Sequence, residues 1–252
     1  MNSRGWFALS ALFVASLACS LFSPVQPTAF ALPPTQAFAT AAPAQWATAA
    51  ATAAATTAEF RDDFDGALGA GWQWLGEDTS AWSLTAAPGY LRLRAGKSNI
   101  NDRPARNFLV REAPQGNFEI ETSTRFTPTA RYQIAGLLVY DSQGNAMQFG
   151  PAYSACPGGF EGGCVYFDSY EGGQFIEPNF ATDVGGVLLS FLRLRREGST
   201  YTASYSADGA SWQVIGWRQS SITPRFVGLL AAQGYDGEES ADFDYFTLRP
   251  LP

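Results

Sequence analysis

Acidic residues are the first candidates for chemistry in this sequence, because its 252 residues include 23 Asp and Glu and no histidine. Hydrolysis of a glycosidic bond needs two carboxyl groups that flank that bond. Glu119 and Glu121 share one face of an expected strand, but no third acid follows them, and Asp168 and Glu171 straddle an expected turn. We therefore interpret all four as solvated residues of a sheet rather than as catalytic residues.

The lack of histidine and the negative net charge exclude several classes of function. Catalysis by Ser-His-Asp or Cys-His groups is ruled out, and so is a zinc site with histidine ligands. The net charge of −7 disfavours binding to a nucleic-acid backbone. It also disfavours electrostatic attachment to an anionic membrane surface.

Two of the three cysteines lie close together in the sequence. Cys156 and Cys164 flank a segment that contains four glycines. In an oxidising compartment we predict a disulfide between them, the alternative being two free thiols. Without histidine, the two cysteines make a poor metal site.

Aspartates at both ends of the expected domain are candidate calcium ligands. If the terminal strands pair, Asp63 and Asp65 come close to Asp242 and Asp244, and a calcium ion prefers such hard oxygen ligands. The ligand set that we consider is Asp63, Asp65 and Asp244. The alternative, which we favour, is that these charges protect edge strands. We expect no other cofactor.

Aromatic residues are abundant, with 19 Phe, 10 Tyr and 7 Trp. Most fall on apolar faces and must belong to the core. Five instead lie near glycine-rich loops or strand ends, where a ring can stack on a sugar while its hydroxyl bonds to sugar hydroxyls. These five are Tyr153, Phe160, Tyr166, Tyr170 and Tyr235. The alternative for each is an ordinary half-exposed aromatic side chain.

These residues must be positioned by strands. Leu192 and Leu194 alternate with Arg193 and Arg195, and Glu197-Gly198 and Asp208-Gly209 supply two tight turns, so 192–212 predicts antiparallel hairpins. Roughly a dozen short strands are expected, without helical periodicity. The clearest are 90–94, 107–112, 118–126, 133–140, 146–153, 165–170, 187–195, 226–231 and 241–246. The sequence therefore predicts an all-β, two-sheet antiparallel sandwich of the jelly-roll type.

Composition divides the chain into three parts. Residues 1–18 have one positive charge and then an apolar run of signal-peptide length. Residues 19–58 are rich in Ala, Thr and Pro, carry no charge, and predict a disordered tether. Residues 59–252 are charged and form the expected β-sandwich domain, which is long enough for one sizeable core.

The leader predicts export by one of two routes. The segment Ser16–Cys19 resembles a bacterial lipoprotein signal, which would make Cys19 the lipidated residue. The segment Ala29–Ala31 instead fits ordinary secretion, and an uncleaved anchor is a third alternative. In either cleaved form the domain is extracytoplasmic, lipid-anchored or secreted, and it meets a membrane only through an N-terminal lipid.

Three segments carry a family resemblance. Trp82–Leu93, Leu192–Trp212 and Ala241–Phe246 resemble the C-terminal accessory domain of bacterial β-xylosidases and a related bacterial domain family, and the opening Asp63-Phe64-Asp65 is similar as well. The resemblance implies a fold of the concanavalin A-like lectin/glucanase superfamily and an expectation of sugar binding. No catalytic propeller precedes the domain in this sequence, so we do not expect xylosidase activity from it.

Two family motifs need separate treatment. Related glucanases carry Glu-x-Asp-x-x-Glu on one concave strand, and this sequence lacks that motif. The segment Ser206–Trp212 resembles the Asp-box turn of sialidases without the residue between Asp and Gly, which predicts a turn-forming role for Asp208.

Three functions remain in order of preference. The first is a membrane-tethered, non-catalytic carbohydrate-binding domain with a glycan as its partner. The second is a protein-binding or cell-envelope structural module. The third is a glycoside hydrolase or polysaccharide lyase with an unrecognised site. An aromatic platform in a concave groove favours the first, and two carboxylates about 5–10 Å apart in that groove favour the third.

Overall fold

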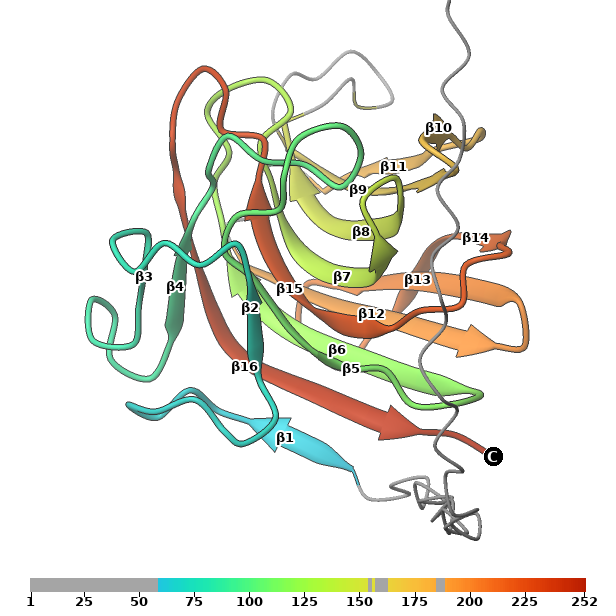
Figure 1. Ribbon diagram of the computed structural model, residues 1–252, viewed down its shortest axis with the longest axis horizontal. Helices are drawn as coiled ribbons and strands as arrows, with labels where there is room; N and C mark the ends of the chain where they lie inside the picture. Colours follow the sequence, from blue (N-terminus) through green and yellow to red (C-terminus); the bar gives the residue numbers. More distant parts are fainter. Residues whose placement is uncertain (1–58, 154–155, 157–162, 185–188) are drawn as a thin grey trace, which may run out of the picture. The chain divides into compact units, whose positions relative to one another are not determined.

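The computed structural model describes residues 59–252, apart from 154–155, 157–162 and 185–188 (Figure 1). The signal peptide, the tether and the predicted lipidation site Cys19 therefore lie outside the described residues. So does Phe160. The described part of the chain has no helix that is long and apolar enough to cross a membrane.

The described residues form two antiparallel sheets of eight strands each, which confirms the predicted all-β sandwich. In the first sheet, here called sheet A, seven strands form one path of hydrogen-bonded neighbours, and β1 pairs with β16 outside this path. That path is β14 (Gln213–Gln219), β13 (Thr200–Ser206), β12 (Leu189–Glu197), β6 (Phe118–Arg125), β16 (Ser240–Pro250), β4 (Leu91–Arg94) and β3 (Trp82–Ser83), with β1 at Phe60–Asp62.

The second sheet, sheet B, has β11 paired with β9 beside its main path. That path is β10 (Gln174–Phe175), β9 (Cys164–Glu171), β8 (Asn145–Ala152), β7 (Ile134–Ser142), β15 (Phe226–Ala232), β5 (Phe108–Glu112) and β2 (Gln73–Leu75), with β11 at Phe180–Asp183. The strands that the sequence did not predict are only two to four residues long. Segments this short do not show a recognisable alternation of apolar and polar residues.

The two-residue alternation places one face of each sheet in a shared core. On β12, Leu192 and Leu194 are buried in this core, whereas Arg193 and Arg195 lie on the outer face of sheet A. Gly198 and Gly209 adopt positive φ angles of 58° and 73° in the turns on either side of β13, as the turn residues predicted.

Sheet B also buries much of its other face. In Figure 1 strands β7 and β8 are bent, and the open side of the bend faces away from β6 and β12. On this concave face a second apolar cluster forms around residues of β5, β7 and β15, and Ile100 from the loop 95–107 is fully buried in it. The loop is fixed there by backbone hydrogen bonds from Gly144 to Ile100 and from Gln233 to Ser98. The concave face is thus partly covered, and only its remainder can bind a ligand.

The two cysteines close the connection between β8 and β9. Cys156 and Cys164 form the predicted disulfide, with their Cα atoms 5.7 Å apart. Cys164 lies opposite Ala152 in the ladder between the two strands. The bond therefore fixes one end of the strand pair that carries the candidate site described below.

The opening segment of the domain is fixed by Asp62, which the sequence did not single out. Its carboxylate accepts hydrogen bonds from the backbone N–H of Phe64 at 2.9 Å and of Gly69 at 2.7 Å, and from the indole Nε1 of Trp72 at 2.7 Å. Trp72 in turn packs against Phe246 of β16, with ring centroids 5.0 Å apart. Asp62 therefore connects β1 to the loop that covers the edge of the core.

Replacement of this carboxylate tests its structural role. We expect Asp62→Ala to lower the free energy of unfolding by about 2–3 kcal/mol, because it leaves buried donors without an acceptor. Asp65→Ala is the matched control, since Asp65 is exposed, and it should change stability by less than about 0.5 kcal/mol. Urea denaturation measures both. Equal stabilities of the two variants would contradict the assignment.

Candidate ligand-binding site

The candidate site is a cavity of ≈ 300 Å³ in the uncovered part of the concave face of sheet B. Strand β9 contributes Tyr166, Asp168 and Tyr170, because these residues alternate with side chains that point into the core between the sheets. The remaining lining residues come from β7, β8, β10 and two loops. They are Tyr132, Ile134, Gln148, Ala152, Phe175 and Gln233.

The polar centre of the cavity is a pair of buried side chains on neighbouring strands. Gln148 of β8 lies opposite Asp168 of β9 in the ladder, and their exposed fractions are 1% and 4%. The amide Nε2 of Gln148 donates a hydrogen bond to Oδ2 of Asp168 at 3.2 Å. Among the described residues, Oε1 of Gln148 and Oδ1 of Asp168 have no hydrogen-bond partner. Buried acceptors are normally paired, so these two oxygens mark a place where a ligand can donate hydrogen bonds.

Burial strongly changes the acidity of Asp168. Removal of the carboxylate from water raises its pKa to about 7, although the hydrogen bond from Gln148 and the positive charge of Arg218 act in the opposite direction. Arg218 donates its own hydrogen bonds elsewhere, chiefly to Oγ of Ser169 at 2.6 Å and to the carbonyl of Pro178 at 2.9 Å. Asp168 therefore changes its protonation state near neutral pH.

Two residues at the rim of the cavity have unusual backbone conformations. Tyr132 and Gln233 line the cavity with φ angles of 71° and 64°, a region that residues other than glycine seldom adopt. The buried side chain of Gln133 stabilises the first loop by accepting from the N–H groups of Thr129 and Ala130 and donating to the carbonyl of Gly237. Strained residues that are held in place by their surroundings are frequent at binding sites.

The structure brings together two of the five aromatic residues predicted from the sequence. Tyr166 and Tyr170 both line the cavity; the hydroxyl of Tyr166 accepts from Nδ2 of Asn179 at 2.7 Å, and Tyr170 packs edge-on against Phe175. Burial raises the pKa of Tyr166 to about 12. Both phenols thus remain neutral over the physiological range.

Tyr153 and Tyr235 are not among the lining residues. The backbone of Tyr153 pairs with Tyr132 and Gln133, next to the rim. The hydroxyl of Tyr235 accepts from Nδ2 of Asn99 at 2.8 Å, and this contact ties Tyr235 to the covering loop 95–107. Its ring also lies under the guanidinium of Arg103, at 4.7 Å. In the described residues these contacts give Tyr235 a structural role.

Comparison with known proteins assigns the family. A family model described as the Beta xylosidase C-terminal Concanavalin A-like domain matches residues 61–249. The chain belongs to this family. The match covers the sandwich and confirms the resemblance that the sequence segments indicated.

Relatives of this xylosidase-type domain are longer proteins. It is 29% identical over 236 residues to an Escherichia coli (strain K12) protein provisionally named a beta-xylosidase, covering 79% of this chain and 40% of that protein. It is 27% identical over 184 residues to the Xylan 1,3-beta-xylosidase of a Vibrio species, covering 65% of this chain and 32% of that enzyme.

A solved structure also matches this domain over only part of a longer protein. The crystal structure of the GH43 protein BlXynB from Bacillus licheniformis superposes with a TM-score of 0.67 at 25% identity, covering 76% of this chain and 39% of that one. The chain therefore spans less than half the length of each of these three proteins.

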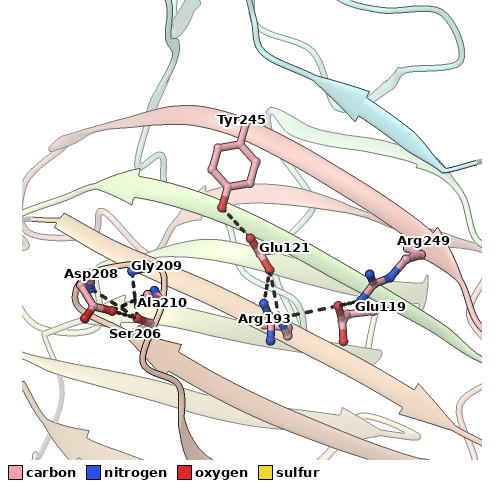
Figure 2. Close-up of polar contacts among 9 residues, drawn as sticks. All are labelled: Glu119, Glu121, Arg193, Ser206, Asp208, Gly209, Ala210, Tyr245 and Arg249. Carbon is pink, nitrogen blue, oxygen red and sulfur yellow. Dashed lines mark hydrogen bonds and ion pairs between the residues drawn. The ribbon is translucent and has the colours of Figure 1, made fainter.

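The first pair of acids considered in the sequence lies on the outer face of sheet A in this xylosidase-type domain (Figure 2). Glu121 accepts from Nη2 of Arg193 at 2.7 Å and from the hydroxyl of Tyr245 at 2.7 Å. Glu119 pairs with Nη2 of Arg249 at 2.5 Å. Both carboxylates are neutralised by partners on neighbouring strands, which supports a structural role. The sequence had suggested that both side chains are freely solvated, and the ion pairs correct this interpretation.

The interpretation of the second pair of acids was wrong. Asp168 is buried rather than solvated, and Glu171 ends the same strand instead of lying beyond a turn. Alternation directs the two side chains to opposite faces of the sheet. Glu171 accepts from the hydroxyls of Ser220 and Ser221 at 2.7 and 2.6 Å. The two acids therefore do not face each other across one cavity.

Asp208 forms the predicted turn. Its Oδ1 accepts from the backbone N–H of Ala210 at 2.8 Å and from Oγ of Ser206 at 2.9 Å (Figure 2). It also accepts from the backbone N–H of Ser211 at 2.7 Å. These donors, led by the N–H of Ser211, lower the pKa of Asp208. The segment is thus a structural turn between β13 and β14, as predicted for Asp208.

The structure does not assemble the calcium ligands considered above. Strands β1 and β16 pair as expected, but Asp63 forms an ion pair with Arg61, and Asp242 forms one with Arg92 at 2.6 Å. In the described ranges no group of three or more His, Cys, Asp or Glu side chains is arranged to hold a metal ion. Asp63, Asp65 and Asp244 therefore do not form a cation site in this part of the chain.

Sequence reasoning did not select Gln148, Tyr132, Phe175 or Gln233. For Gln148 a signal was present, since it is the one strongly polar residue within the apolar segment Ala146–Ala152. Asp168 follows the aromatic and apolar residues Val165, Tyr166 and Phe167 in β9. A strongly polar residue among apolar neighbours in each of two predicted strands was the available indication of a site.

The raised pKa of Asp168 predicts how stability depends on pH. The unfolded carboxyl loses its proton near pH 3.8, whereas the folded one keeps it to about pH 7, so stability falls as pH rises between these values. From pH 5 to pH 8 we expect Asp168 to contribute a loss of about 2–3 kcal/mol, at about 1.4 kcal/mol per pKa unit.

Asp168→Asn should abolish this loss, and Asp65→Asn serves as the matched control that should retain it. Chemical denaturation at pH 5, 6, 7 and 8 measures the effect. Parallel pH profiles for the wild type and Asp168→Asn would show that the carboxyl does not titrate in this range.

Proposed function

We propose that this chain is an extracytoplasmic, non-catalytic carbohydrate-binding domain that binds a glycan in the cavity on the concave face of sheet B. The observation that carries the proposal is the composition of this cavity. Aromatic rings form its walls, and two buried oxygens without partners among the described residues, on Gln148 and Asp168, form its polar centre. Sugars match this chemistry, because they present apolar ring faces together with hydroxyl donors.

Family membership supports a carbohydrate ligand. The family is described from beta-xylosidases, and one relative is named a Xylan 1,3-beta-xylosidase, which supports a sugar ligand. Xylan-derived oligosaccharides are therefore the first ligands to examine. Export is supported by the leader sequence and by the disulfide, which is characteristic of oxidising compartments. Lipidation at Cys19 would tether the domain to a membrane by way of residues 19–58.

The lining of the cavity supports a passive role. Asp168 is the one carboxylate among its described lining residues, whereas the usual glycosidase mechanism needs two. The two other acids considered as catalytic candidates on β6 form ion pairs on the opposite side of the molecule's core. Binding without bond cleavage is the function that this arrangement favours.

Protein binding is a second candidate because of one apolar surface. Val214 and Trp217 on the edge strand β14 are 58% and 59% exposed, and Trp217 borders a cavity of ≈ 380 Å³ with Pro178 and Phe180. Exposed apolar residues of this size occur often at interaction surfaces. This surface also supplies a control for the main proposal.

Isothermal titration calorimetry with xylo-oligosaccharides, supported by a glycan array, tests the proposal. Tyr132 is 58% exposed at the rim, so Tyr132→Ala should leave folding intact and weaken glycan binding about 2- to 10-fold, as expected for loss of one aromatic contact.

Trp217→Ala removes an equally exposed ring from the other surface and should bind as the wild type does. Reduced binding only in Trp217→Ala would place the glycan on β14. Binding to no glycan on the array would instead favour the protein-binding function.

A further inference from the structure

The Gln148 and Asp168 pair restricts the kind of glycan that the cavity can accept. The two residues are direct neighbours across the β8–β9 ladder, share one hydrogen bond and line the cavity, and each has one buried side-chain oxygen without a partner among the described residues. Both free atoms are acceptors when the carboxylate is ionised. A ligand that satisfies them must therefore supply two hydrogen-bond donors close together, and adjacent hydroxyls of one sugar ring have this arrangement.

Charge restricts the ligand further. The described lining residues include no arginine or lysine, and their one ionisable acid is Asp168. A sugar that carries a carboxylate, sulfate or phosphate would meet the like charge of the ionised Asp168 without a compensating cation among the described lining residues. The chain as a whole is also acidic, with a net charge of −7. Neutral sugars are therefore favoured.

The size and walls of the cavity are consistent with a short ligand segment. Its volume of ≈ 300 Å³ lies at the lower end of the range for ligand pockets, about 300–1,000 Å³. Tyr132, Tyr170 and Phe175 supply apolar faces around the polar floor. This arrangement suits one or two sugar rings, oriented by their hydroxyls at the floor and by ring contacts at the wall.

We propose that the Gln148–Asp168 pair binds two adjacent hydroxyl groups of one neutral sugar ring, and that it makes the site selective against acidic sugars. This inference rests on the carbohydrate-binding function proposed above and specifies its ligand. Asp168 and Gln148 are thereby the residues that determine specificity, whereas the aromatic side chains contribute affinity.

The same geometry couples binding to protonation. Ligand hydroxyls that donate to Asp168 replace the water that burial removed, so they stabilise the ionised carboxylate and should cause a proton to be released on binding. The titratable groups that face Asp168 are the phenols of Tyr166 and Tyr170, with the guanidinium of Arg218 across the sheet. None of these three changes charge between pH 5.5 and pH 8. The pH dependence in this window therefore reports on Asp168.

Calorimetric titration of the full chain tests the proposal with three probes: xylotriose, the same trisaccharide with its hydroxyls methylated, and trigalacturonic acid. Xylotriose is neutral and has adjacent hydroxyls, the methylated form lacks the donors, and the third probe is anionic. We expect xylotriose to bind more tightly at pH 8 than at pH 5.5, by up to about 30-fold if only the ionised form binds. Titrations in two buffers of different ionisation enthalpy should show proton release. The other two probes should bind at least tenfold more weakly.

Two variants identify the atoms involved. Asp168→Asn should lose the pH dependence and the proton release, and Gln148→Met, which removes the second acceptor at similar volume, should weaken xylotriose binding while retaining the proton release. Asp65→Asn is the matched control and should behave as the wild type.

The outcomes separate the two proposals. If the wild type binds no glycan, the carbohydrate function fails and this inference fails with it. If the wild type binds xylotriose, but Asp168→Asn keeps the same affinity and pH profile, or trigalacturonic acid binds equally well, the binding function stands and the proposed selectivity is overturned.

Discussion

Burial of alternate side chains between two sheets is the constraint on which the rest of this structure depends. Each strand commits every second residue to the shared core, and each fully buried leucine or phenylalanine contributes about 1.5–3 kcal/mol of transfer free energy. The central hairpin shows the constraint clearly, since Leu192, Leu194 and Tyr201 all lie in this core. The intervening residues are then free to form other surfaces, and the two sheets use this freedom differently.

Sheet A turns its second face to solvent and fills it with paired charges. Arg193 lies between Glu119 and Glu121 and also stacks over Trp212, with its guanidinium carbon 3.7 Å from the ring centroid. A polar network of this kind fixes the register of adjacent strands, since each partner must lie opposite its neighbour. It leaves few charges available for a ligand. The face is consequently well suited to structural support.

Sheet B buries one face in the shared core and much of the other face as well, and this explains its candidate site. Its concave face is covered in one part by Ile100 and the loop 95–107, and the rest remains open. A carboxyl group in such an environment is costly to ionise, because it loses hydration without gaining a direct cationic partner. Asp168 is tolerated at this position at a cost in stability near neutral pH. Such a cost is common at binding sites, where groups must be left available to a ligand.

The sequence by itself determined the fold class, the turns at Gly198 and Gly209, the disulfide and the family. These follow from local rules, since alternation, turn chemistry and cysteine spacing are all readable over a few residues. It also indicated Tyr166 and Tyr170 as candidates.

Only the tertiary structure decided which polar residues meet. Gln148 and Asp168 are 20 positions apart, and their pairing depends on the register of β8 against β9 within the sheet. Register and burial arise from contacts among distant segments, which explains why Asp168 resembled an ordinary solvated acid in the sequence and proved to be a buried residue beside a cavity in the fold.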